Sequence, residues 1–212
     1  MRTIQKVLVG QSGGPTVAIN SSLAGIINQA HKHDIEVIGM CNGIEGFLEG
    51  RTVNLSDIFH PTRNKQSVEL LAQTPSSFLG SCRYKLPNPT QDKNFYQKIT
   101  SRLTSLVIDG ILYIGGNDSM DTVDKISRYF AENLIDIPTI GIPKTIDNDL
   151  EGTDHTPGFG SAARYIATAV QELARDAEVY GKPSITIIET MGRDAGWLGA
   201  ASALAHEKNE QA

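Results

Sequence analysis

Cysteine is scarce in this sequence. Only Cys41 and Cys82 occur among 212 residues, and they do not form the CxxC pattern of a metal or redox site. Two cysteines cannot build a disulfide framework, so we expect both to be reduced and structural. Long hydrophobic runs are also missing, so no segment is predicted to cross a membrane. Because the N-terminus lacks the apolar region of a signal peptide, a cytoplasmic protein is expected.

Positive charge is not in excess either. The formal net charge is −5 and no run of lysine and arginine occurs, which argues against nucleic acid as a partner. Anionic small molecules stay compatible with this charge, because a few local cations can outweigh the overall sign. The apolar fraction of 40% is that of an ordinary globular protein with a buried core.

What the sequence does contain is an alternation of short apolar strands with longer helical patterns. Strands are predicted at residues 7–9, 35–39, 111–114, 138–142 and 185–188. This alternation is typical of a three-layer α/β/α sandwich with a mostly parallel sheet. Residues 51–90 carry several prolines and are expected to form loops around short helices.

A long helix is predicted over residues 159–179 from the spacing of its apolar residues. Its buried face is expected to contain Ala162, Ile166, Ala169, Val170 and Leu173. Trp197 is most simply a core residue. The polar ending, residues 206–212, is expected to be the tail of a helix.

Four polar or glycine-rich segments directly follow four of the predicted strands, at residues 10–15, 115–119, 144–149 and 191–194. In an open parallel sheet, ligands bind outside the carboxyl ends of the strands. We therefore expect these four segments to gather at one edge of the sheet and to carry the chemistry.

The glycines Gly13 and Gly14 precede a predicted helix, an arrangement that suits phosphate, because bare backbone amides can approach its oxygens. A tight turn without a ligand is an equal alternative for this pair taken alone. The chain has no GxxxxGK[ST] Walker loop. Residues 158–163 match GxGxxA but follow a polar loop and not a strand, so no dinucleotide fingerprint is predicted.

The segment 115–119 offers both room and ligands for a metal–phosphate complex. Its two glycines leave space for a bulky anion, while Asn117 and Asp118 offer oxygen ligands that suit Mg²⁺. Asn, Asp and Ser are also common at helix N-caps, and capping is expected to account for one of Asn117, Asp118 and Ser119.

The acidic segment, Lys144-Thr145-Ile146-Asp147-Asn148-Asp149, is the predicted centre of the chemistry. A carboxylate held beside a sugar hydroxyl can act as general base. Lys144 would neutralise phosphate charge during phosphoryl transfer. A surface turn with paired carboxylates is the alternative.

Two arginines are candidate phosphate ligands. Arg83 stands in a loop of small residues, Gly-Ser-Cys-Arg, which suits bidentate binding of an anion. Arg193 follows the last predicted strand. Each arginine alone is more often a surface residue than a ligand. His155 and His206 are expected to be solvated or capping, and neither is a candidate catalytic group.

Taken together, five segments resemble the phosphofructokinase family. They occur in the order of that family and at similar spacing, at residues 12–14, 80–83, 115–119, 143–149 and 191–197. A single segment is weak evidence, whereas five in order are specific. The resemblance implies a phosphofructokinase-like fold and a homo-oligomer, either a dimer or a tetramer. It also implies transfer of a phosphoryl group, with Mg²⁺ on the donor, to the 1-hydroxyl of fructose 6-phosphate, which gives fructose 1,6-bisphosphate in glycolysis.

The resemblance implies roles for the residues of the sugar site. Asp147 would be the general base that takes the proton from the sugar hydroxyl, and Thr145 and Asp149 would flank the reacting sugar. Arg193 would lie near the transferred phosphoryl group. The sugar site would be lined by Met191, Gly192 and Arg193.

By the same resemblance, the donor would be bound by Gly13, Arg83, Asn117, Asp118 and Ser119. ATP-using members usually have glycine in place of both Asp118 and Lys144. A bulkier Asp118 would obstruct the path of an α-phosphate, and Lys144 would supply charge for a short, dense anion. Both residues favour pyrophosphate as the donor, with ATP as the alternative.

The sequence also departs from the family pattern. Asn117 stands where many members have a metal-binding aspartate, so Asp118 is expected to be the main metal contact. Ser184 stands at about the place of an arginine that reaches a neighbouring subunit, and Lys182 is the candidate to replace it. Family members are considerably longer. Residues 1–212 are therefore expected to form the donor-binding domain and the start of the sugar-binding half, with the remainder of the fold absent.

Two other functions compete with this interpretation. A truncated, non-catalytic module that binds a phosphosugar or a nucleotide is compatible with the shorter length and with Asn117, although the intact acidic segment argues against it. A nicotinamide oxidoreductase is disfavoured, because no dinucleotide fingerprint follows a predicted strand.

Overall fold

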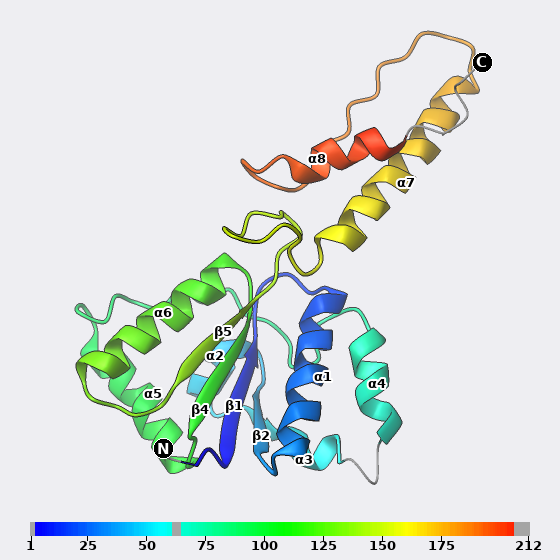
Figure 1. Cartoon of the computed structure of the whole chain (residues 1–212). Coiled ribbons are helices and arrows are strands. Elements are labelled where there is room, and N and C mark those ends of the chain that lie inside the picture. The colour runs from blue at the N-terminus through cyan, green and yellow to red at the C-terminus, as the bar shows by residue number, and fades with distance from the viewer. Residues whose placement is uncertain (1–2, 61–64, 206–212) are drawn as a thin grey trace. The chain divides into compact units, whose positions relative to one another are not determined.

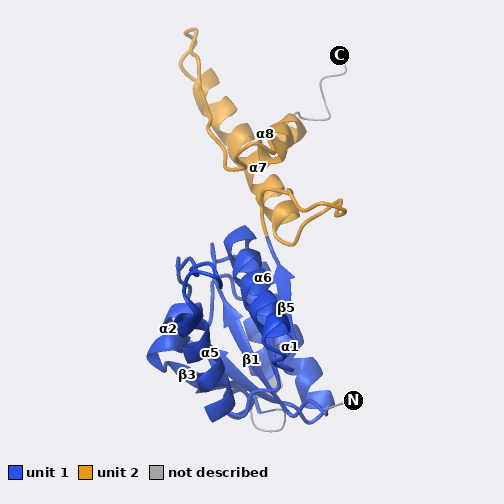
Figure 2. Ribbon diagram, turned by 90° about the vertical axis from the view of Figure 1, so that its left-hand side faces the viewer, with its two compact units in different colours: residues 1–144 blue, residues 145–212 orange. Residues whose placement is uncertain are grey.

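The structure, a computed structural model, describes residues 3–60 and 65–205. The chain divides after Lys144 into two units, residues 1–144 and residues 145–212 (Figure 2). The first unit contains all five named strands, and the second consists of helices and long loops. No helix of the described part is long and apolar enough to cross a membrane.

The strands of the first unit form one sheet in the order β3-β2-β1-β4-β5. Their bounds are β1 Lys6–Gln11, β2 Glu36–Met40, β3 Thr52–Asn54, β4 Gly110–Gly115 and β5 Thr139–Pro143. β3 is antiparallel to β2, and the other neighbouring strands are parallel. The predicted mostly parallel sheet is thereby confirmed. Because β1, β4 and β5 are parallel neighbours, the loops that follow them begin at the same edge.

Helices cover both faces of this sheet (Figure 1). One face carries α1 (Val17–Lys32), α3 (Leu55–Ile58) and α4 (Lys65–Gln73). The other carries α2 (Gly43–Glu49), α5 (Lys93–Ser105) and α6 (Asn117–Glu132). The predicted three-layer α/β/α sandwich is therefore confirmed.

The strands divide their apolar side chains between two cores. Leu8 of β1 and Tyr113 of β4 join the core beside α2, α5 and α6, whereas Val7 and Val9 join the core beside α1, α3 and α4. Successive side chains of a strand point to opposite faces, and both faces of this sheet are covered. The strands therefore appear in the sequence as short continuous apolar runs.

The second unit consists of α7 (Phe159–Glu178), α8 (Trp197–Ala201) and a short 3₁₀ helix, η1 (Ser202–Ala205). Its small core contains Ala163, Leu198 and Ala201. The face of α7 that was predicted to be buried is confirmed only in part: Ala162, Ile166, Ala169 and Val170 are half-buried, and Leu173 is exposed. Trp197, expected in the core, is 53% exposed. The apolar stripe of α7 is longer than the short helices that pack on it, so most of it is only partly covered within this unit.

The strand predicted at residues 185–188 is also wrong, since residues 183–190 have no regular secondary structure. Ile185 and Ile187 are 92% and 91% exposed. A strand requires hydrogen bonds to a neighbouring strand, and the described part of the second unit contains no strand beside this segment. Lys182 and Ser184 are both exposed there. His206 and the predicted helix tail lie outside the described residues.

Candidate active site

The glycine loop, residues 12–14, lies between β1 and α1. Gly13 has a left-handed φ of 86°, and a Cβ at this position would lie 3.4 Å from the backbone nitrogen of Gly116. Thr16 is the N-cap of α1 and makes no side-chain capping hydrogen bond, and the first turn of α1 contains no acidic residue. Backbone N–H groups at a helix start that no side chain caps, next to glycines, favour an anion.

The loop after β4 leads into α6 in a similar way. Gly116 is the N-cap and has no side chain, so the expectation that one of the next three residues caps this helix is wrong. Asn117, Asp118 and Ser119 instead form the first turn, with Asn117 and Asp118 exposed and Ser119 buried. The hydroxyl of Ser119 fills the space that a side chain on Gly115 would need. Packing therefore requires glycine at position 115.

Lys144 directly follows β5 and is only 7% exposed. Its backbone N–H donates to the carbonyl oxygen of Gly115 at 2.9 Å. Its Nζ lies 3.9 Å from the position that a Cβ on Gly14 would take, and its carbonyl oxygen lies 3.7 Å from the corresponding position on Gly116. The loops after β1, β4 and β5 thus meet, and the ammonium group lies beside the glycine loop.

The arginine loop, residues 80–83, hydrogen bonds to the glycine loop from a distant part of the sequence. The hydroxyl of Ser81 donates to the carbonyl oxygen of Gly13 at 2.7 Å. The hydroxyl of Ser12 donates to the carbonyl oxygen of Cys82 at 3.0 Å. Arg83 itself is exposed. The structure therefore brings the segment of Arg83 to the same place as the predicted donor-binding glycine.

Tyr113 of β4 lies beneath the arginine loop. Its hydroxyl oxygen accepts the backbone N–H of Ile44 at 3.2 Å and lies 4.0 Å from the thiol of Cys82. Burial, and secondarily the neighbouring Cys82, raises the pKa of Tyr113, so the phenol stays neutral. Cys41 and Cys82 are both free thiols, as predicted.

A buried polar pair, which sequence analysis missed, holds the segment that leads into the arginine loop. The side-chain nitrogen of Gln11 donates to the carbonyl oxygen of Ile19 at 3.0 Å and to Oδ1 of Asn20 at 3.2 Å. Gln11 Oε1 accepts the N–H of Leu79 at 2.8 Å, and Asn20 Oδ1 accepts the N–H of Phe78 at 2.8 Å. The sequence did contain a signal: Gln11 in a strand and Asn20 in a helix stand at positions where the apolar pattern predicts core residues.

In the second unit, Asp147 of the acidic segment shares a hollow of about 450 Å³ with residues of the loop between α7 and α8. The hollow is lined by Asp147, Glu189, Thr190, Met191, Gly192 and Arg193. Asp147 is half-buried, whereas Met191 and Arg193 are exposed. Gly192 and Arg193 both have a positive φ, 136° and 49°. The structure therefore brings Asp147 together with the three residues that were predicted to line a sugar site.

Two of the predicted sugar-site residues do not line this hollow. Thr145 is buried, and its hydroxyl accepts the backbone N–H of Asp147 at 3.0 Å. Asp149 is exposed. Glu189 and Thr190 do line the hollow and were not predicted, because they lie between the strand predicted at residues 185–188 and the segment 191–194. Their position directly before the predicted sugar-site residues was the only signal.

Hydrogen bonds connect the acidic segment to the loop before α7. The backbone N–H of Thr156 donates to Oδ1 of Asn148 at 2.9 Å, and Nδ2 of Asn148 donates to the carbonyl oxygen of Asp154 at 3.1 Å. The Thr156 hydroxyl donates to the carbonyl oxygen of Thr145 at 2.7 Å. His155, in the same loop, is exposed, and its ring centre lies 6.0 Å from the ring centre of Phe159.

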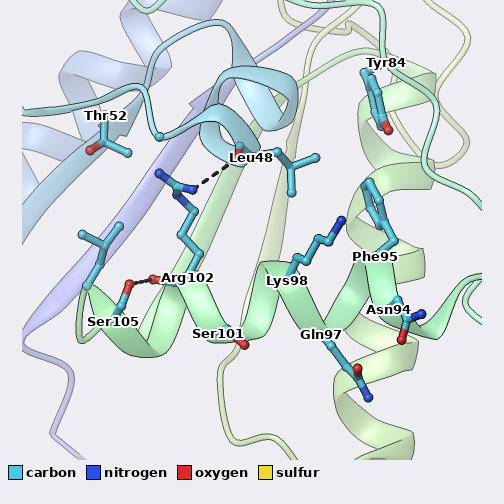
Figure 3. Close-up of a pocket in the computed structure, with 12 residues that line it drawn as sticks. Leu48, Thr52, Tyr84, Asn94, Phe95, Gln97, Lys98, Ser101, Arg102 and Ser105 are labelled. Atoms are coloured by element: carbon cyan, nitrogen blue, oxygen red, sulfur yellow. Dashed lines mark hydrogen bonds between the residues drawn. The ribbon is translucent and has the colours of Figure 1, made fainter.

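A separate hollow of about 1160 Å³ lies in the first unit between α2 and α5 (Figure 3). Arg102 of α5 donates to the carbonyl oxygen of Leu48 at 3.2 Å, and its guanidinium lies 5.8 Å from the ring centre of Phe47. Tyr84 and Phe95 stack with their ring centres 6.0 Å apart. The Arg102 contacts pack α5 against the end of α2, and the ring stack joins α5 to the residue that follows the arginine loop. None of the predicted site residues lines this hollow, and we do not include it in the candidate active site.

Metal binding was predicted at the start of α6. Among the residues that the structure describes, no three His, Cys, Asp or Glu side chains are grouped so that they could hold a metal ion. Mg²⁺ does not require such a group, since it usually binds one or two carboxylates together with phosphate oxygens and water. Asp118 in the first turn of α6, next to Asn117 in the sequence, fits that mode of binding.

Comparison with known proteins gives consistent matches. The sequence model of the family described as Phosphofructokinase matches residues 6–210. A pyrophosphate–fructose 6-phosphate 1-phosphotransferase of Xanthomonas campestris is 42% identical over 208 residues, which is 97% of this chain and 49% of the relative. A more distant relative, an ATP-dependent 6-phosphofructokinase of Persephonella marina, is 31% identical over 204 residues, 95% of this chain and 56% of the relative.

A solved structure supports the same match. The pyrophosphate-dependent phosphofructokinase of Marinobacter aquaeolei superimposes with a TM-score of 0.81 at 37% identity, covering 97% of this chain and 50% of that chain. The chain thus spans about half the length of the curated relatives that it matches.

Proposed function

Since the chain belongs to the phosphofructokinase family, we propose that it supplies the donor site and part of the sugar site of an enzyme that phosphorylates fructose 6-phosphate. The phosphoryl group would pass from pyrophosphate to the 1-hydroxyl of the sugar and give fructose 1,6-bisphosphate, a reaction of glycolysis. The observation that carries this proposal is the meeting of the loops after β1, β4 and β5 around Gly13, Gly116 and Lys144.

The phosphates of the donor would bind at the glycine loop. The starts of α1 and α6 present backbone N–H groups and the positive ends of helix dipoles, both of which favour an anion. Lys144 adds a positive charge beside Gly14, and Arg83 would add another from the arginine loop. In phosphoryl transfer the protein acts mainly by positioning and by neutralising charge, and these groups would supply both.

Pyrophosphate is the favoured donor because of two side chains. Asp118 is exposed in the first turn of α6, where its carboxylate would obstruct the α-phosphate of ATP. The Lys144 ammonium suits a compact anion whose charge is concentrated on two phosphorus centres. ATP is the second candidate, because one relative of this chain is ATP-dependent.

The acceptor would bind in the second unit, at the hollow that Asp147 and Arg193 share. Asp147 would take the proton of the 1-hydroxyl while that oxygen attacks phosphorus and the bond to the leaving phosphate breaks. Arg193 would balance charge on the transferred group. Met191 and Gly192 would contact the sugar, and Thr145 and Asp149 would flank it.

Mg²⁺ would be held by Asp118 and Asn117 together with oxygens of the donor. When bound, the ion neutralises part of the phosphate charge. The dimer or tetramer and the cytoplasmic location expected from the sequence remain predictions.

An assay of the full-length protein with fructose 6-phosphate and either donor tests the proposal. We expect Mg²⁺-dependent turnover with pyrophosphate. Turnover with ATP alone would overturn the choice of donor. Binding of fructose 6-phosphate without turnover with either donor would favour the non-catalytic module instead.

A double substitution to the residues of ATP-using members tests whether these two positions select the donor. Replacing Asp118→Gly and Lys144→Gly together should lower kcat/KM with pyrophosphate more than kcat/KM with ATP. An equal loss with both donors would show that these two positions do not select the donor.

A further inference from the structure

We propose that Thr156 and Asn148 are positioning residues that hold the acidic segment so that Asp147 can accept a proton. This inference rests on the proposed role of Asp147 as general base. Neither side chain lines the hollow that Asp147 shares with residues 189–193. Their effect would therefore reach the reaction through the backbone of the acidic segment and not through contact with the sugar.

The burial of Thr156 is the first observation. The side chain is 3% exposed, although His155 and Pro157 on either side are exposed. Its hydroxyl donates to the carbonyl oxygen of Thr145 at 2.7 Å. The hydroxyl of Thr145 in turn accepts the backbone N–H of Asp147 at 3.0 Å. Thr156 therefore holds Thr145 in place, and Thr145 in turn holds the backbone of Asp147, the proposed base.

The backbone of Asn148 is the second observation. Asn148 directly follows Asp147 and has a left-handed φ of 58°. Asparagine adopts this conformation more readily than most residues, because its short polar side chain can bond to nearby backbone. Here it does so twice, by accepting from the N–H of Thr156 at 2.9 Å and by donating to the carbonyl oxygen of Asp154 at 3.1 Å. The acidic segment is therefore held on both sides of Asp147.

The loop that supplies these bonds is itself attached to a long helix. Gly158 is the N-cap of α7, has a left-handed φ of 106°, and pairs with Thr145 in a parallel bridge. The carbonyl oxygen of Thr156 accepts the N–H of Phe159, the first residue of α7, at 3.0 Å. A helix of 20 residues is a rigid support. Functional groups held from rigid elements keep their geometry better than groups on free loops.

The side-chain hydroxyl of Thr156 can be removed with little change of shape by Thr156→Val in the full-length protein. We expect kcat with fructose 6-phosphate and pyrophosphate to fall about 10- to 100-fold, because small misplacements of a reacting group cost that much. KM for fructose 6-phosphate should change less than about threefold, since substrate contacts are kept. Thr156→Ser keeps the hydroxyl and should restore kcat to within about threefold of the wild type.

Thr153→Val is the matched control, because Thr153 is an exposed threonine of the same loop. It should leave kcat unchanged. Asn148→Gly keeps the left-handed backbone accessible while it removes both side-chain bonds, and it should lower kcat in the same way as Thr156→Val. A Thr156→Val protein or an Asn148→Gly protein with wild-type kcat would overturn the proposal for that residue. Thermal melting followed by circular dichroism identifies a variant that fails to fold, and the other variant then provides the test.

A double-mutant cycle with Asp147→Asn distinguishes positioning from a general structural role. If Thr156 acts through Asp147, Thr156→Val should lower kcat in the wild-type background and have almost no effect in the Asp147→Asn background. An equal fold-loss in both backgrounds would overturn the positioning role. Wild-type turnover by Asp147→Asn alone would overturn the proposed base instead, so the two failures are distinguishable.

Discussion

The hydroxyl of Ser81 donates a 2.7 Å hydrogen bond to the carbonyl oxygen of Gly13 and so joins two loops that are 68 residues apart in the sequence. If these loops bind the donor together, Ser81→Ala should raise KM for pyrophosphate about 3- to 10-fold, the range that the loss of one hydrogen bond gives. Steady-state kinetics on the full-length protein measure this. Ser101→Ala, at an exposed serine of α5, is the control and should change nothing. An unchanged KM for pyrophosphate in Ser81→Ala would contradict the proposal that the two loops bind the donor together.

Gln11 should be important for stability. Gln11→Leu fits a buried site but leaves the N–H of Leu79 and the carbonyl oxygen of Ile19 without their side-chain partner. The free energy of unfolding should fall by about 1–3 kcal/mol, the cost of unsatisfied buried polar groups. Urea unfolding measures it, with Gln97→Leu at an exposed glutamine as the control. Equal stability of the two variants would mean that the Gln11 network contributes little.

Two glycines should respond to alanine with opposite signs. A Cβ on Gly10 of β1 would collide with the ring of Tyr113, so Gly10→Ala should destabilise the protein by about 1–3 kcal/mol. A Cβ on Gly25 of α1 would meet nothing within 4 Å. Gly25→Ala should therefore stabilise the protein by about 0.5–1 kcal/mol, as expected in a helix interior. Thermal or urea unfolding of both variants checks the signs. Stabilisation by Gly10→Ala would contradict the close packing of Gly10 against Tyr113, and destabilisation by Gly25→Ala would contradict the open space at Gly25.

Tyr96 should make stability fall at high pH. Burial, with smaller contributions from Asp121 and Asp92, raises the pKa of Tyr96 from 10.0 to about 12. Above its ordinary pKa the unfolded chain loses the phenol proton, while the folded protein keeps it. The contribution of Tyr96 to the free energy of unfolding is therefore constant below about pH 10 and is lost as the pH rises from about 10 to about 12.

Tyr96→Phe tests this dependence. The variant loses the 2.6 Å hydrogen bond to the carbonyl oxygen of Pro87, so it should be less stable at pH 8. Between pH 10 and pH 12, however, its unfolding free energy should fall less steeply than that of the wild type. Urea unfolding at several pH values measures both slopes, and identical slopes would refute the role of Tyr96.

The sheet and its loops were predictable because their signals are local. A short apolar run such as residues 7–9, followed by glycines and then a helical pattern, predicts a parallel strand with a ligand loop at its end. The convergence of Gly13, Gly116 and Lys144 follows from the parallel pairing of β1, β4 and β5. That these loops share one edge could be predicted without knowing which strands pair, because parallel strands all end at the same edge of a sheet.

Features that depend on partners elsewhere in the chain were not predictable in the same way. Residues 185–188 have the composition of a strand, but a strand forms only where another strand offers hydrogen bonds. β3 is three residues long and is defined by its antiparallel pairing with β2. The bonds of Gln11 to Leu79 and of Thr156 to Thr145 join loops whose approach the sequence pattern does not reveal.

The proposed function is tested most directly by the turnover of Asp147→Asn in the full-length protein, measured with saturating pyrophosphate, fructose 6-phosphate and Mg²⁺. Asparagine keeps the size of the side chain and removes its ability to accept a proton. We expect kcat to fall at least about 100-fold, the contribution of a general base, while KM for pyrophosphate changes less than about twofold. A kcat within about twofold of the wild type would contradict the assignment of Asp147 and with it the central claim about the acidic segment.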